Sequence, residues 1–206
     1  VSLPMPALKE GEFLVKQTHM SLDPAMRTWL QERDDSYMPP VQIGEVMRSY
    51  GVGEVVESLN PRFPAGSRVV GVTGWSEYVL GNEEMTIIDP SVSAEAVLSI
   101  FYITGLTAYA GLMKIGMPKK GETLVVTGAA GSVGSLVGQL AKAEGLRVVG
   151  IAGSDEKCKW LVDELGFDAA INYKSDNLEA QLSAAVPNGV DIFYENTGGP
   201  IQEIIF

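Results

Sequence analysis

The stretch VTGAAGSVGS, residues 126–135, decides the fold of this chain. It begins as a β-branched run, breaks into glycines and alanines, and is followed by residues 136–145, in which apolar residues recur at helical spacing. A strand that turns through glycines into a helix offers the unpaired N–H groups of the helix N-terminus to a pyrophosphate. The stretch therefore predicts a phosphate-binding turn for a dinucleotide.

The glycine spacing departs from G-x-G-x-x-G at its first position, which Ala129 occupies. Alanine there is compatible with a tight turn. Gly131 lies where the backbone approaches phosphate, and Gly134 lies where the helix packs closely. The alternative is a glycine-rich connection that binds nothing, and the succession of strand, turn, helix and second strand favours the binding site.

Helix and strand patterns alternate from about Ser91 to the end of the chain. A helical pattern over residues 93–116, with a break near Gly105, precedes four strands at 122–128, 147–153, 169–173 and 190–198. Three helical patterns connect these strands, at 132–145, 155–166 and 177–186. This alternation predicts an α/β fold with a parallel, doubly wound Rossmann sheet over residues 96–206.

The alternation stops in mid-pattern at Phe206. A Rossmann sheet has about six strands at roughly 30 residues per βαβ unit, so we expect about 60 further residues. The sheet is therefore expected to be incomplete here, in an internal segment of a longer chain or a truncated product.

Residues 1–95 have a different texture and are predicted to form a separate domain. Short β-like runs at 12–17, 51–58, 67–72, 76–81 and 84–89 alternate with Gly/Pro turns, which is typical of a small barrel or sandwich. One helix is expected in SLDPAMRTWLQE, where Asp23 would act as the cap and Pro24 would be the first helical residue.

The composition restricts the partners. With 15 basic and 26 acidic residues, the formal net charge is -11, which would repel nucleic acid. No apolar run is long enough to cross a bilayer, so no membrane partner is expected. The single cysteine, Cys158, excludes a disulfide framework within the chain and fits a reducing compartment, so we expect a cytoplasmic protein.

The end of the second strand indicates which dinucleotide is bound. An NAD enzyme places an acid there for the ribose hydroxyls, but this chain has Gly153 and Ser154. Asp155 and Glu156 fall in the first helical turn, where the helix dipole alone favours them. Lys157 opposes that dipole, and a 2′-phosphate beside Ser154 would reverse the penalty. This pattern favours NADP(H) over NAD(H), with a solvated surface lysine as the alternative.

The sequence lacks the residues that a zinc site or a nucleophilic triad would need. A catalytic zinc needs three ligands from Cys, His and Asp/Glu, and a structural zinc usually needs four, mostly cysteines. His19 and Cys158 are far apart in sequence and belong to different domains, so we expect no metal. One histidine without a nucleophile motif also makes a Ser/His/Asp triad implausible. His19 is interpreted as a satisfied strand or loop residue.

Six segments together resemble one family, in family order and along nearly the whole chain: MSLDPAMRTWL, SYGVGEVVES, GLTAYAGL, GAAGSVGSLVGQLAK, AGSDEKCKWLVDELGFDAAINYK and YENTGGP. They are similar to the zinc-independent medium-chain dehydrogenase/reductase family, which includes prostaglandin reductase (leukotriene B4 12-hydroxydehydrogenase), plant alkenal double-bond reductases and curcumin reductase. Each segment alone is a weak signal, and the set is specific.

The resemblance implies a GroES-like β-barrel domain, whose first strand would precede this segment, followed by a Rossmann domain. It also implies hydride transfer from NADPH to the β-carbon of an α,β-unsaturated ketone or aldehyde. A homodimer is expected for the full chain. The alternatives are an NADPH quinone reductase of the same superfamily and a noncatalytic, truncated NADP-binding module.

The resemblance also implies roles for particular residues. The pyrophosphate would meet Gly131, Ser132, Val133 and Gly134. The 2′-phosphate would meet Lys157 and Tyr173, with Ser154 close by, and Asn196 would approach the ribose or nicotinamide. Tyr50 and Met47 would line the substrate pocket. No proton donor and no catalytic residue is assigned.

Overall fold

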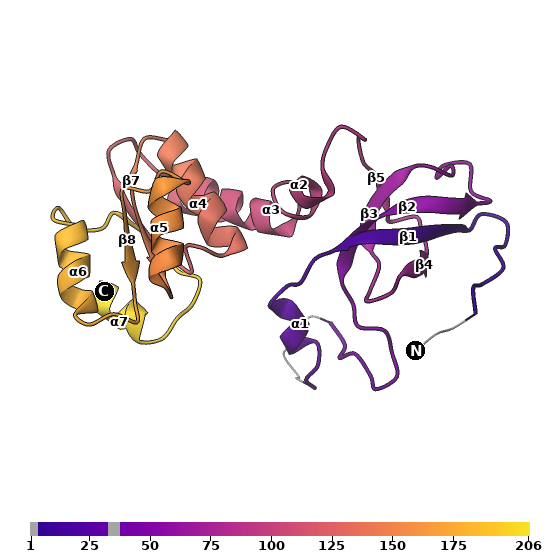
Figure 1. The fold of residues 1–206 in the computed structure, drawn as a ribbon, viewed down its shortest axis with the longest axis horizontal. Coiled ribbons are helices and arrows are strands. Elements are labelled where there is room, and N and C mark those ends of the chain that lie inside the picture. Colours follow the sequence, from indigo (N-terminus) through magenta and orange to yellow (C-terminus); the bar gives the residue numbers. More distant parts are fainter. Residues whose placement is uncertain (1–3, 33–37) are drawn as a thin grey trace. The chain divides into compact units, whose positions relative to one another are not determined.

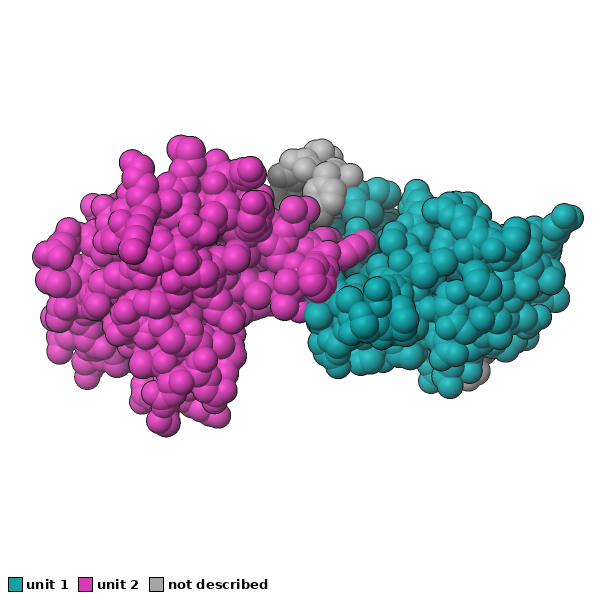
Figure 2. Space-filling view, turned by 90° about the horizontal axis from the view of Figure 1, so that it is seen from above, with its two compact units in different colours: residues 1–98 teal, residues 99–206 magenta. Residues whose placement is uncertain are grey.

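The computed structural model describes residues 4–32 and 38–206. The chain folds as two compact units, residues 1–98 and residues 99–206, which Figure 2 distinguishes by colour. Each unit has its own sheet and its own hydrophobic core. Within the described ranges, no helix is long and apolar enough to cross a membrane.

Unit 1 is built on a five-stranded antiparallel sheet of order β4-β1-β2-β3-β5 (Figure 1). Its strands are β1 (Phe13–Met20), β2 (Tyr50–Ser58), β3 (Arg68–Val72), β4 (Tyr78–Leu80) and β5 (Thr86–Ile87). Two short helices accompany them, α1 (Ala25–Thr28) and α2 (Ala94–Leu98). The rings of Phe13 and Phe63 stack at 4.3 Å in the centre of the core. All five β-like runs of the sequence thus form strands.

The expected cap of α1 was wrong. Pro24, rather than Asp23, occupies the N-cap position, and no side chain caps the helix. The Asp23 carboxylate instead accepts a hydrogen bond from the Ser21 hydroxyl at 3.0 Å, while its backbone carbonyl accepts from Met26 N–H. The helix is only four residues long, so a backbone turn suffices to start it.

Unit 2 contains a four-stranded parallel sheet of order β8-β7-β6-β9. This is the order of one mononucleotide-binding half with the first strand of a second half beside it. Its strands are β6 (Thr123–Thr127), β7 (Arg147–Ala152), β8 (Ala169–Asn172) and β9 (Ile192–Tyr194). Its helices are α3 (Ile103–Tyr109), the π-helical η1 (Ala110–Gly116), α4 (Ser132–Ala143), α5 (Asp155–Asp163), α6 (Leu178–Ala185) and α7 (Pro200–Ile205). The sequence patterns did not predict α7.

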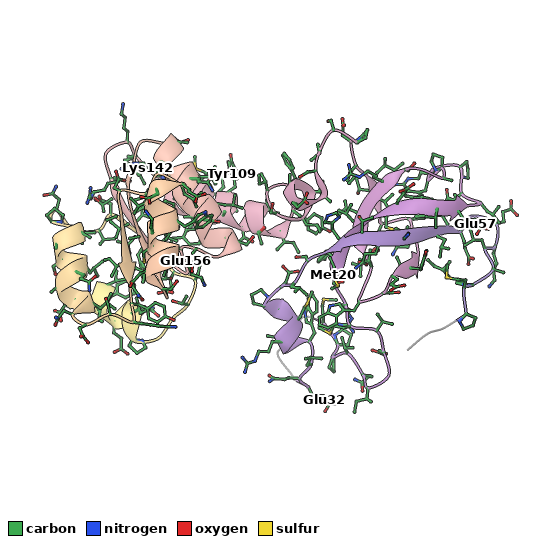
Figure 3. All side chains as sticks on the ribbon, viewed as in Figure 1. Met20, Glu32, Glu57, Tyr109, Lys142 and Glu156 are labelled. Atoms are coloured by element: carbon green, nitrogen blue, oxygen red, sulfur yellow. The ribbon has the colours of Figure 1, made fainter. Side chains whose placement is uncertain are left out.

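Helices cover both faces of the parallel sheet. The strands alternate apolar side chains between the two faces, so each face packs against helices. Leu124 and Val126 of β6 belong to a core with residues of α3, η1, α4 and α5. Val125, between them, belongs to a second core with Leu182 of α6, and Ile201 of α7 packs against that core. Figure 3 shows the side chains that fill these layers.

The helical pattern over residues 93–116 is broken close to the expected position near Gly105. The helical pattern is interrupted at residues 99–102, between α2 and α3, and Gly105 lies inside α3. A β-carbon at Gly105 would lie 1.8 Å from the carbonyl oxygen of Ile100, and the Gly105 N–H donates to the Ser99 carbonyl. Glycine is therefore present for close packing against the preceding turn.

Candidate dinucleotide site

The glycine turn connects β6 to α4 in a conformation that glycine makes possible. Gly128 has a φ of +57°, and Gly131 is the extended N-cap of α4, with its N–H donating to the Gly128 carbonyl at 2.8 Å. A β-carbon at Gly134 would lie 2.4 Å from that same carbonyl oxygen and 2.8 Å from the α-carbon of Ala129. Gly134 therefore allows the first turn of α4 to pack directly on the glycine turn.

The first turn of α4 has free donors. Among the described residues, nothing accepts a hydrogen bond from the N–H groups of Ser132, Val133 and Gly134, and the first backbone bond is Ser135 N–H to Gly131 at 2.9 Å. These groups and the positive end of the helix dipole suit an anion.

A cavity of about 710 Å³ lies beside this turn, at the carboxyl ends of the parallel strands. That edge is where ligands bind in open α/β sheets. Four parts of unit 2 line the cavity. They are the glycine turn, the end of β7 with the start of α5, the end of β8 with the start of α6, and the segment from Thr197 into α7. The lining residues are Gly128, Ala130, Gly131, Ile151, Ala152, Gly153, Lys157, Tyr173, Lys174, Leu178, Thr197, Gly198, Pro200, Ile201 and Ile204.

The structure thus places three of the sequence-predicted residues, Gly131, Lys157 and Tyr173, around one cavity. Sequence reasoning missed Lys174, whose ammonium lies 5.8 Å from the centre of the Tyr173 ring. Its position directly after the predicted tyrosine was the available signal. The two lysines are the cationic side chains of the lining, in a chain whose net charge is -11.

Ser154 does not line the cavity and instead caps α5. Its hydroxyl oxygen accepts a hydrogen bond from the Lys157 N–H at 3.3 Å. A β-carbon at Gly153 would lie 3.1 Å from the Tyr173 ring, so the small residue lets the ring lie close to the end of β7. The side chain of Asn172 donates to the Asp155 carboxylate at 2.7 Å, which engages this acid at the start of the helix.

Asn196 connects β9 to β6 and is absent from the cavity lining. Its side-chain amide donates to the Thr127 carbonyl at 2.9 Å, and its backbone N–H donates to the Thr127 hydroxyl at 2.8 Å. Its predicted contact with ribose or nicotinamide stays a prediction.

Glu195, beside Asn196, was missed by the sequence analysis. One carboxylate oxygen, Oε1, accepts from the Thr127 hydroxyl at 2.6 Å and from the Gly198 N–H at 2.8 Å. Burial raises the pKa of this carboxyl, but the hydrogen bonds from Thr127, Gly198 and Thr197 outweigh it and lower the pKa below its usual value. The signal in the sequence was an acid at a strand tip, directly before the polar turn NTGG.

Tyr50 and Met47 belong to unit 1. Tyr50 begins β2 opposite Val72 of β3, and its carbonyl accepts from the Ser21 N–H at 2.8 Å. The Met47 carbonyl accepts from the Trp75 N–H at 2.8 Å. Both side chains are half-buried, and their role in a substrate pocket stays a prediction.

His19 and Cys158 are in different units. The His19 ring lies 3.5 Å from the Glu95 carboxylate and 3.0 Å from the Thr18 hydroxyl. Burial, then the charge of Asp155, raises the pKa of the Cys158 thiol. In the parts of the chain that the structure describes, no three His, Cys, Asp or Glu side chains are grouped as a metal site would require.

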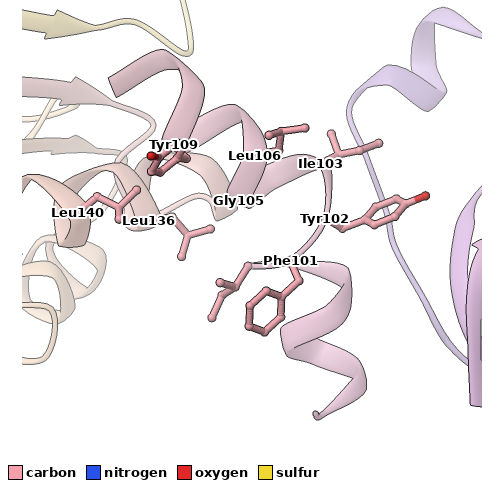
Figure 4. A pocket seen from close by; sticks show the side chains of 9 residues that line it. Phe101, Tyr102, Ile103, Gly105, Leu106, Tyr109, Leu136 and Leu140 are labelled. Atoms are coloured by element: carbon pink, nitrogen blue, oxygen red, sulfur yellow. The ribbon is translucent and has the colours of Figure 1, made fainter. Parts of the chain in front are cut away.

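A second cavity of unit 2, of about 620 Å³, has different chemistry (Figure 4). Leu106 and Tyr109 of α3 and Leu136 and Leu140 of α4 line it, together with the exposed Phe101. These side chains offer apolar surface and lack a cation, so this cavity does not suit a dinucleotide phosphate.

The two sheets and the glycine turn define a class of protein, in which a GroES-like unit precedes a Rossmann unit. Comparisons with known families agree with this class. Residues 1–88 match the N-terminal domain of oxidoreductase, and residues 132–204 match the zinc-binding dehydrogenase family. The second family is described as zinc-binding, whereas the matched residues of this chain include no histidine and only one cysteine, Cys158.

Individual relatives indicate which members of this class the chain resembles. The chain is 47% identical over 207 residues to a putative NADP-dependent oxidoreductase of Bacillus subtilis, covering 99% of this chain and 60% of that protein. It is 42% identical to the NADPH-dependent curcumin reductase of Escherichia coli, covering 95% and 57%. The structure of CurA from Vibrio vulnificus in complex with NADPH superposes with a TM-score of 0.94 at 40% identity, covering 100% of this chain and 61% of that one.

The chain belongs to the zinc-independent medium-chain dehydrogenase/reductase family. It spans about 60% of the length of the relatives that it matches.

Proposed function

We propose that this chain binds NADP(H) in the cavity beside the glycine turn. The observation that carries the proposal is the composition of one cavity: the glycine turn forms one wall, and Lys157 and Lys174 supply positive charge. Such a site matches the shape and the charge of an adenine dinucleotide that carries an extra phosphate. The names of NADP-dependent relatives support the same assignment.

Particular groups of unit 2 have distinct roles in this proposal. The pyrophosphate would accept hydrogen bonds from the free N–H groups of residues 132–134, next to Gly131. Lys157 would pair with the 2′-phosphate, and Tyr173 would lie beside it in the same lining. Ser154 would act by fixing the start of α5 and thereby the position of Lys157.

We further propose that the whole protein reduces the C=C bond of α,β-unsaturated ketones or aldehydes. Relatives named for this class of substrate support the proposal, including the curcumin reductase and a tobacco 2-alkenal reductase that is 41% identical over 199 residues. The bound cofactor would supply the hydride to the β-carbon. The chain would hold the substrate with residues of the 1–95 domain, Tyr50 and Met47 among them, and the cofactor with the 96–206 domain.

Turnover by the purified protein tests the activity. We expect NADPH to be oxidised in the presence of a conjugated enone, and to remain unchanged with the corresponding saturated ketone. Replacing NADPH by NADH should lower the rate strongly. Turnover with a quinone alone would indicate a quinone reductase, and NADPH binding without turnover would indicate a binding module; either result would contradict the proposed reaction.

Self-association is the remaining part of the proposal. It rests on the family resemblance, which implies a homodimer for the full chain. Sedimentation equilibrium should give twice the monomer mass for a homodimer, and the monomer mass at all concentrations would contradict it.

A further inference from the structure

We propose that Glu195 is a positioning residue that fixes the Thr197–Pro200 wall of the cavity against the glycine turn. The inference rests on the proposed NADP(H) site and adds a residue that contacts neither the glycine turn's donors nor the two lysines. It concerns how the cavity is formed before any ligand enters.

One carboxylate oxygen of Glu195 gathers donors from two separate parts of the chain. Oε1 accepts from the N–H groups of Thr197 at 2.5 Å and Gly198 at 2.8 Å, and from the Thr197 hydroxyl at 3.1 Å. It also accepts from the hydroxyl of Thr127 at 2.6 Å, across a sequence separation of 68 residues. A local turn would need only the first set of bonds. The bond to Thr127 additionally ties this turn to the end of β6, next to the β6–β9 strand pairing.

Thr127 is a rigid attachment point. It is the last residue of β6, its side chain is fully buried, and the glycine turn begins at the next residue. Its hydroxyl donates to Glu195 and accepts from the Asn196 N–H, which uses both functions of the group. Any displacement of Glu195 therefore also disturbs the end of the strand that carries the phosphate-binding turn.

The anchored segment lies directly against the glycine turn and lines the cavity. Thr197, Gly198 and Pro200 belong to the lining, and a β-carbon at Gly128 would lie 3.3 Å from the Thr197 methyl group. Gly198 and Gly199 both have positive φ values, of 70° and 77°. Two adjacent glycines in this conformation cost conformational entropy on ordering, so an anchor at this point reduces the freedom that ligand binding would otherwise have to remove.

The second carboxylate oxygen, Oε2, is buried and lacks a hydrogen-bond partner in the described structure. A buried acceptor without a partner is costly, so the arrangement favours the position of Oε1 over full satisfaction of the group. The orientation of the Glu195 carboxylate is therefore set by the donors to Oε1, which belong to the Thr197–Pro200 wall and to Thr127.

The test compares Glu195→Gln and Thr127→Val with Thr127→Ser, which keeps the hydroxyl, and with Asp168→Asn as a matched control. Asp168 is also a hydrogen-bonded acid of the parallel sheet, accepting from Val148 N–H and the Lys142 ammonium, but it lies at the amino end of the strands. For each variant, urea unfolding, NADPH affinity and amide exchange of residues 197–198 without ligand are measured under conditions where the protein is folded.

We expect Glu195→Gln and Thr127→Val to weaken NADPH binding about tenfold and to accelerate amide exchange at residues 197–198. Glu195→Gln removes the negative charge that strengthens the bonds to Oε1, and Thr127→Val removes the hydroxyl that donates to it. Thr127→Ser keeps the hydroxyl, so its NADPH affinity and its amide exchange at residues 197–198 should stay close to those of wild type. Asp168→Asn should lower the free energy of unfolding while leaving NADPH affinity within about twofold of wild type.

NADPH affinity unchanged in Glu195→Gln and Thr127→Val would overturn the inference and leave the proposed function intact. An equal loss of affinity in Asp168→Asn would overturn it as well, since a general loss of stability would then explain the effect. Failure of the unsubstituted chain to bind NADPH would instead overturn the proposed function and the inference with it.

Discussion

Two cavities of unit 2 have similar volumes, about 710 Å³ beside the glycine turn and about 620 Å³ along α3. The first has the glycine turn and two lysines in its lining, while the second is lined by apolar side chains such as Leu106, Leu136 and Leu140. The difference indicates that the chemistry of the lining, rather than the volume, distinguishes the cavity proposed to bind the dinucleotide. Backbone donors and positive charge must converge at the carboxyl ends of the strands.

The largest effect is expected at the contact between α4 and the glycine turn. In Gly134→Ala the new β-carbon would lie 2.4 Å from the Gly128 carbonyl oxygen, so backbone must move. Overpacking of this kind destabilises by about 1–3 kcal/mol. We expect NADPH binding to fall at least a hundredfold, because the turn and the free N–H groups are displaced together; urea unfolding and fluorescence titration measure the two effects.

Gly116→Ala is the matched control, because a β-carbon there would have ordinary contacts, the nearest at 3.5 Å. It should change the free energy of unfolding by less than about 0.5 kcal/mol and leave NADPH binding unaltered. Wild-type affinity in Gly134→Ala would break the link between this turn and the dinucleotide.

A smaller effect is expected from the charge of the first cavity. Lys157→Ala should weaken NADPH binding about tenfold or more and NADH binding little, because a charge-assisted hydrogen bond to the 2′-phosphate is lost. Lys159 lies on the same helix and pairs with Asp163 at the surface, so Lys159→Ala serves as the control and should affect neither ligand. Equal losses for NADPH and NADH in Lys157→Ala would remove the assigned role.

Asp168 lies at the opposite end of the parallel sheet from the dinucleotide cavity, and its contribution to the free energy of unfolding is expected to depend on pH. Burial raises the pKa of Asp168, but hydrogen bonds from Lys142 and Val148 outweigh it and lower the pKa below its usual value. Because the folded pKa is depressed, the stabilisation is complete above the unfolded pKa of about 4 and is lost as pH falls through the folded pKa.

Asp168→Asn should therefore cost about 1–3 kcal/mol near pH 6, and the difference from wild type should shrink toward pH 2. Urea unfolding at several pH values measures this. A difference that stays constant down to pH 2 would show that the charge of Asp168 is not the cause. Figure 3 labels Lys142, the partner of this carboxylate.

The smallest effect is expected in the apolar cavity. Phe101 is 69% exposed, so Phe101→Ser removes little packing and touches no donor of the dinucleotide site. NADPH affinity should stay within about twofold of wild type, and stability within about 0.5 kcal/mol. A large loss of NADPH affinity would show that the α3 cavity takes part in cofactor binding.

Local patterns predicted the strands of both sheets and the glycine turn, because periodicity and glycine chemistry act over a few residues. They also assigned Gly131 and Lys157 to one site, since parallel strands end at a shared edge, and the family resemblance added Tyr173 to it. They placed the helix break only approximately, near Gly105 rather than at residues 99–102, because the contact of Gly105 with Ile100 is made only in the folded chain. Glu195 was missed for the same reason, because its partner Thr127 lies in another strand.

The central claim, an NADP(H) site beside the glycine turn, is tested most directly by competition binding. NADPH fluorescence is titrated with the purified chain, and then adenosine 2′,5′-bisphosphate or adenosine 5′-monophosphate is added as competitor. The bisphosphate should displace NADPH at concentrations at least tenfold lower than the monophosphate, and Lys157→Ala should abolish that advantage. Equal competition by the two nucleotides, or no NADPH binding at all, would contradict the assignment.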